Sequence, residues 1–120
     1  MTGSILNAIK KPLLGNDVEK HFDDQIIMEI NAVFMVLNQL HVGPATGYFI
    51  TDENQTWEEF LPDEEVRKEL GALPTYMYQK VRLIFDPPTS SFVIDSISRQ
   101  IAEFEWRLKT EAEGDKYVNG

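Results

Sequence analysis

Residues 90–113, SSFVIDSISRQIAEFEWRLKTEAE, decide the fold of this chain. Apolar residues recur in this stretch every three or four positions, at Ile94, Ile97, Ile101, Phe104 and Leu108. This spacing puts them on one face of a helix, in a pattern like a coiled-coil seam. Thr89 or Ser90 can cap the helix and Gly114 ends it. At ~1.5 Å per residue the helix would be roughly 36 Å long, the width of a small domain.

A second amphipathic helix is predicted from Asp23 to Leu40. Its apolar stripe advances by alternating steps of four and three, through Ile26, Ile30, Val33, Leu37 and Leu40. Asp23 and Asp24 lie in the first turn, where the helix dipole favours anions. Gly43 and Pro44 end the helix. Few polar positions remain on it, so we expect this helix to be mostly buried.

Shorter helices are predicted on either side of the second one. Residues 4–14 have a helical stripe, although Pro12 weakens this prediction because a proline removes a helix hydrogen bond beyond the first turn. The region 63–85 breaks into two helices at Gly71, and Pro74 starts the second as a first-turn proline. Together the segments predict an all-α fold, a small bundle of about four helices.

The stretch Val42 to Thr56 shows no helical period. Residues 47–51 predict a short strand or an extended arm within this loop. Thr56 can cap a brief helical turn after it, with Glu59 as the reciprocal partner in a capping box. Loops of this length in a compact domain often serve binding.

The composition limits the class of protein. The chain has 120 residues, which suits one domain, expected at 1–114 with a flexible tail at 115–120. It has no cysteine, which excludes disulfides and thiol chemistry. No stretch approaches the ~20 apolar residues of a membrane span, and the start lacks the apolar run of a signal peptide. We expect no membrane association, with the cytoplasm as the default location.

The net charge of −9 comes from 20 acidic and 11 basic residues. An acidic surface repels phosphate, which argues against a protein that grips DNA. The stretch 52–65 has seven acids and no base, and it is either a solvated face or a surface aimed at a basic partner or at passing DNA. The candidate lumen or docking acids are Asp52, Glu53, Glu58, Glu59, Glu64 and Glu65.

A catalytic or metal site is not predicted. His21 and His41 lie at opposite ends of the second helix, roughly 30 Å apart, and are expected to be cap or surface residues. Asp52 to Gln55 lack the spaced acids and central glycine of a calcium loop. No glycine-rich phosphate loop is present. We therefore expect no cofactor, no metal and no enzymatic activity.

Three aromatic residues are candidates for a subunit interface: Tyr78, Trp106 and Tyr117. Tyr76 and Tyr78 are two positions apart on a helix, so one is expected in the core and the other at the surface or an interface. Trp106 lies off the main seam of the last helix, where it could pack under a loop or form a subunit contact. With Phe92 and Val93, it gives that helix more than one apolar face, which favours assembly.

The most distinctive stretch is 76–91, YMYQKVRLIFDPPTSS, with a rigid corner at Asp86, Pro87 and Pro88. Together with Glu105-Trp106-Arg107-Leu108 and the second helix, it resembles a family of phage head–tail connector proteins. The resemblance covers about Ile5 to Leu108.

The resemblance implies a structural protein with no catalytic residues. Connector proteins of this kind are small helical bundles that form a ring, commonly a dodecamer, under the portal of a filled capsid. They extend the DNA channel and dock the next neck or tail protein, so the expected location is the virion, with the host cytoplasm during assembly. The alternative is an acidic helical adaptor or regulatory module that acts in a discrete complex.

Overall fold

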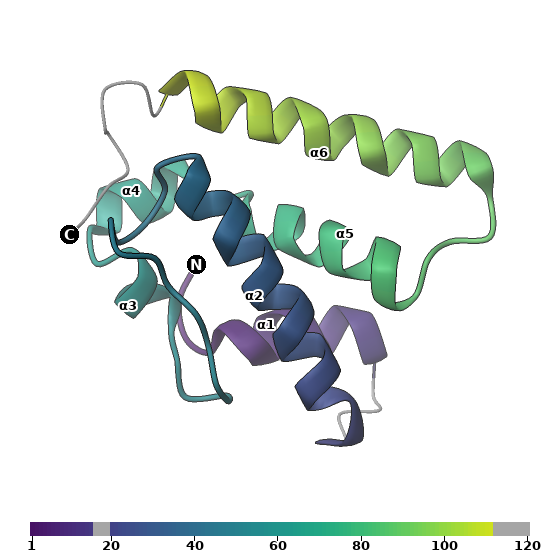
Figure 1. Ribbon diagram of the computed structural model, residues 1–120, viewed down its shortest axis with the longest axis horizontal. Coiled ribbons are helices and arrows are strands. Elements are labelled where there is room, and N and C mark those ends of the chain that lie inside the picture. Colours follow the sequence, from purple (N-terminus) through teal and green to yellow (C-terminus); the bar gives the residue numbers. More distant parts are fainter. Residues whose placement is uncertain (16–19, 112–120) are drawn as a thin grey trace.

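The protein is described by a computed structural model over residues 1–15 and 20–111, and helices make up its architecture (Figure 1). The α-helices are α1 (Ile5–Leu14), α2 (Asp23–Gln39), α3 (Trp57–Phe60), α4 (Glu64–Glu69), α5 (Leu73–Phe85) and α6 (Ser91–Glu111), and one 3-10 turn, η1, covers Lys20–Phe22. The predicted all-α fold is confirmed. The short helices α3 and α4 correspond to the predicted turn after Thr56 and to the first part of the predicted region 63–85.

Helix α5 is the centre of the bundle, because α1, α2 and α6 all pack against it. Figure 1 shows α6 lying along α5 on the outside of the molecule, with α2 crossing on another side. The core is filled by large side chains with almost no exposed surface, among them Ile5, Ile9, Ile30, Phe34, Leu37, Trp57, Phe60, Tyr76 and Met77. An ion pair of 2.6 Å between Lys10 Nζ and Asp23 Oδ1 joins α1 to the start of α2.

Two prolines sit inside helices without breaking them. Pro12 lies in the last turn of α1 and is exposed, so the helix continues to Leu14 and loses only the hydrogen bond to the carbonyl of residue 8. The Ser4 hydroxyl accepts a hydrogen bond from the backbone N–H of Asn7 and caps this helix. Pro74 lies in the first turn of α5, where its missing N–H has no helical partner in any case.

The loop between α2 and α3 is extended, with no β-strand among the described residues. An antiparallel bridge joins Ser4 to Thr56 at the end of this loop. Thr56 caps α3 as predicted, since its side-chain oxygen accepts from the backbone N–H of Glu59 at 3.2 Å. Among the described residues, no helix combines the length and apolarity needed to cross a membrane.

The corner Asp86-Pro87-Pro88 lies where the chain turns from α5 to α6. Asp86 ends α5, and its N–H donates to the carbonyl of Arg82 at 2.9 Å. Two successive prolines cannot extend the helix, so the chain reverses and α6 returns along α5. The backbone N–H of Val93 donates to the Ser90 hydroxyl at 3.4 Å, which makes Ser90 the capping residue of α6.

Candidate functional site

Two asparagines on α2, seven residues apart, hold the loop against the helix. The Asn31 side chain donates to the Ile50 carbonyl at 2.9 Å and accepts from the Ile50 N–H at 2.8 Å. The Asn38 amide donates to the carbonyls of Pro44 and Ala45 at 3.3 and 3.4 Å. Residues 44–50 therefore run beside α2 in one fixed position.

An aromatic cluster forms the floor under this loop. The rings of Phe34, Tyr48 and Phe60 lie with centroids 4.8–5.3 Å apart. Gly43 has φ +95°, and a Cβ at this position would collide with the Phe60 ring, so glycine is required on both counts. Burial, and secondarily the charge of Glu59, raises the pKa of Tyr48 from 10.0 to about 12.

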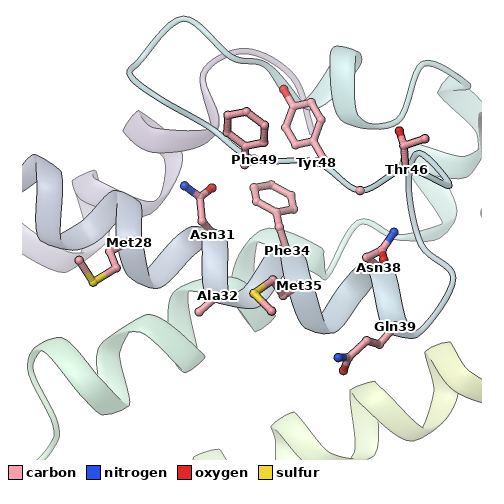
Figure 2. Close-up of a pocket in the computed structure, with 11 residues that line it drawn as sticks. Met28, Asn31, Ala32, Phe34, Met35, Asn38, Gln39, Thr46, Tyr48 and Phe49 are labelled. Atoms are coloured by element: carbon pink, nitrogen blue, oxygen red, sulfur yellow. The ribbon is translucent and has the colours of Figure 1, made fainter.

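The loop and α2 enclose an open groove with a volume of about 870 Å³ (Figure 2). Met28, Met35 and Phe49 line it, and their side chains are 68%, 66% and 67% exposed. Ala32 lies between the two methionines on the helix and is also exposed. The expectation that α2 is mostly buried is therefore wrong for this face, because no described element covers it.

Two large aromatic side chains are exposed near the two ends of α6, and the charged residues Asp95, Arg99 and Glu103 are exposed between them. Phe92 is 74% exposed and Trp106 is 65% exposed. Trp106 also lines a pocket with Leu70 and Ala72 of the turn between α4 and α5, and both of its predicted roles stay predictions. By helical spacing, positions 92 and 106 lie opposite the buried stripe of Ile97, Ile101 and Leu108. Tyr78 is half-buried on α5, and Tyr117 lies outside the described residues.

A polar cluster fixes α6 to α5. The Tyr76 hydroxyl donates to Glu105 Oε2 at 2.5 Å, and Lys80 Nζ pairs with the same oxygen at 2.8 Å. The rings of Tyr76 and Phe104 stack with centroids 4.8 Å apart. Burial, followed by the contact with Glu105, raises the pKa of Tyr76 far above its ordinary value. Sequence reasoning missed this cluster, because the partners lie about thirty positions apart and follow no local pattern.

The six candidate acids are all exposed, and they lie on the loop, α3 and α4, away from the α5–α6 corner (Figure 1). Several also have local structural roles. Asp52 accepts from the N–H of Asn54 at 2.7 Å, and Glu64 and Glu65 lie 3.9 and 3.6 Å from Lys68 Nζ. Glu58 accepts from the N–H of Gly3 at 2.9 Å, and this bond lowers the pKa of Glu58.

The histidines are surface residues beside helix ends, as expected. His21 lies in η1 with its ring edge-on to Phe22, and His41 follows the end of α2 in a left-handed conformation. Within residues 1–15 and 20–111, no three metal-ligating side chains converge. The features of the described residues that can carry a function are therefore the exposed apolar side chains of α2, its loop and α6, and the exposed acids of residues 52–65.

Comparison with known proteins supports a structural interpretation. Neither the curated proteins nor the solved structures yield a significant match. The family model described as Phage connector protein matches residues 5–115, from the start of α1 to just beyond the end of α6. The match includes α2, the loop groove, the double-proline corner and the long last helix, and the chain therefore belongs to the phage connector protein family.

Proposed function

We propose that this chain is a non-enzymatic subunit of the connector of a tailed phage, assembling as a ring under the portal. In this role it extends the DNA channel and docks the next neck or tail protein. The family match supports a connector-type structural role in the virion and association with other virion proteins. The proposed ring lies beneath the portal and has twelve copies, as is common among related connectors.

The observation that carries this proposal is that large apolar side chains are exposed on two separate elements of one small chain. The α2–loop groove exposes Met28, Met35 and Phe49, and the outer side of α6 exposes Phe92 and Trp106. Large exposed apolar patches on a soluble protein mark sites where another protein binds. A subunit with one neighbour on each side needs two such surfaces, whereas a module in a one-to-one complex needs only one.

The exposed acids of residues 52–65 suit a protein that passes DNA without binding it. A channel wall that carries negative charge repels phosphate, so the DNA is not held in place. The candidate docking or lumen acids Asp52, Glu53, Glu58, Glu59, Glu64 and Glu65 are exposed on neighbouring elements. We propose that they face the channel or the next neck protein, and that the helical domain at 1–114 forms the body of each subunit.

Electron microscopy of the purified chain with and without its portal tests the assembly. We expect rings at the portal vertex, and light scattering should show a mass of many subunits. A discrete complex of fixed small stoichiometry would overturn the ring and favour the acidic adaptor.

Charge neutralisation tests the acidic surface separately. Changing Glu58, Glu59, Glu64 and Glu65 to glutamine should leave the helical fold intact and impair DNA ejection or docking of the next protein. The control neutralises an equal number of acids on other elements: Glu29, Asp86, Asp95 and Glu103. Normal assembly and ejection by the first variant would remove these acids from the channel and from the docking surface.

A further inference from the structure

We infer that the outer face of α6 in one copy docks into the α2–loop groove of the next copy, with the two helices antiparallel. This inference rests on the proposed ring and names the two surfaces that close it. The groove is the one lined by Met28, Met35 and Phe49, and the outer face of α6 carries Phe92, Arg99 and Trp106.

The two surfaces lie on different sides of the molecule. Helix α5 packs against both α2 and α6, and Figure 2 shows α5 and α6 on one side of α2 with the loop on the other. A contact between two different patches is head to tail, and repetition of a head-to-tail contact produces a ring when the rotation closes. An apolar patch that paired with itself would instead stop at a dimer.

The spacing of side chains on the two faces matches. Met28, Ala32 and Met35 advance by four and three residues along α2, and all three are exposed. Phe92, Arg99 and Trp106 advance by seven along the line opposite the buried stripe of α6. Both patterns repeat every ~10 Å along the helix axis, which allows two helices to interlock side by side.

The chemistry of the two faces is also complementary. Ala32 leaves space beside Met28, so an aromatic ring of α6 can lie against Met28. Thioether groups beside an aromatic ring make favourable contacts of the kind that Met28 can offer to Trp106. The groove already has the aromatic wall that such a ring would pack against, since Phe49 faces it from the loop (Figure 2).

Charge selects the antiparallel direction and a second copy as the occupant. At the end of α2 nearest Met28, the hollow lined by Asp23, Asp24, Asp52 and Glu53 holds four acids against one base, Lys20. The end of α6 nearest Trp106 carries Lys109, an exposed base on an acidic chain. Neither Asp24 nor Lys109 forms an ion pair with a described residue. When Trp106 packs at Met28 in antiparallel helices, Lys109 lies beside Asp24. Lys109 follows Trp106 by three residues, and Asp24 precedes Met28 by four residues, so the two side chains are at similar distances from the Met28–Trp106 contact.

Cysteine cross-linking tests this arrangement, because the chain has no cysteine of its own. Copies with Met28→Cys are mixed with copies with Trp106→Cys, assembled on the portal and oxidised. We expect covalent dimers from the mixture and few from either variant alone. The control replaces Trp106→Cys by Ser98→Cys, an exposed position to the side of the outer face. The predicted yield is at least about tenfold above this control, since a disulfide needs Cβ atoms roughly 4 Å apart.

Charge reversal tests the direction. Asp24→Lys and Lys109→Asp should each lower ring yield by about two- to fivefold, as expected for an exposed pair, and the double variant should restore it. Dimers from Met28→Cys alone or Trp106→Cys alone would show symmetric pairing and overturn the head-to-tail contact. Rings that form with no more Met28–Trp106 cross-link than the control would overturn this interface and leave the proposed function standing. Failure of the unmodified chain to form rings on the portal would overturn both.

Discussion

Helices α2 and α6 are both long and both amphipathic, but they contribute differently to the fold. Over its 17 residues α2 buries five side chains, whereas α6 buries only three over 21 residues. Helix α2 packs against α1 and α5 and also holds the loop, while α6 packs chiefly against α5. A hydrophobic stripe therefore predicts a helix, but it does not predict how many other elements pack against that helix. We therefore expect α2 to belong to the most stable part of the molecule and α6 to open first.

Matched core truncations give the largest expected difference between the two helices. Ile30→Ala removes a fully buried side chain on α2 and should lower the free energy of unfolding by about 4 kcal/mol. Ile101→Ala, on α6, should lower it by about 2 kcal/mol because a less enclosed site leaves a smaller cavity. Urea denaturation of both variants measures the difference. Equal losses would show that α6 is as firmly built into the core as α2.

Removal of the loop attachment tests the additional role of α2. Asn31→Ala leaves the N–H and the carbonyl of Ile50 without their side-chain partner and should cost about 2 kcal/mol. Asn38→Ala is the matched control, since its two bonds are longer and should cost less than about 1 kcal/mol. Thermal denaturation would measure both. A larger loss from Asn38→Ala would contradict the assignment of Asn31 as the main attachment.

Tyr76→Phe tests the polar cluster that fixes α6. Loss of the hydroxyl removes the hydrogen bond to Glu105 and should lower the free energy of unfolding by about 1 kcal/mol. Amide hydrogen exchange should become faster in α6 and stay unchanged in α2. Tyr78→Phe, at a half-buried position on α5, serves as the control and should leave exchange in both helices unchanged.

The smallest expected effect is a loss of folding stability that appears only at high pH. The folded protein raises the pKa of Tyr48 from 10.0 to about 12 and raises that of Tyr76 further. A raised folded-state pKa contributes stability below the unfolded pKa, and this contribution is lost as pH rises above about 10. Stability should therefore fall between pH 10 and pH 12. Tyr48→Phe and Tyr76→Phe should each flatten this decline, and a decline unchanged in both variants would contradict the raised pKa values of the two tyrosines.

Local sequence patterns predicted most of the helices and their ends. The stripes of α2 and α6, the stop at Gly71 and the cap at Thr56 all follow from interactions within a few residues. Pro12 was a misleading signal, because a proline in the last turn of a helix removes only one hydrogen bond.

The groove was not predicted, because it depends on contacts between distant parts of the chain. The buried stripe of α2 was sufficient to predict the helix. The opposite face, which carries Met28 and Met35, was therefore not predicted to be an exposed apolar surface. The pairing of Asn31 with Ile50 is a contact across 19 residues that no periodicity reveals. The sequence does contain one signal for this groove. Met28 and Met35 are seven residues apart, as are Asn31 and Asn38, so the two pairs form neighbouring rows along one helix.

The contrast between the two tryptophans has a practical consequence. The chain contains only Trp57, which is 1% exposed in the core, and Trp106, which is 65% exposed on the outer side of α6. Emission from the first reports unfolding, while quenching of the second by iodide reports whether anything covers that side of α6. The natural protein thus has two built-in optical probes, one for folding and one for association, and neither requires a dye.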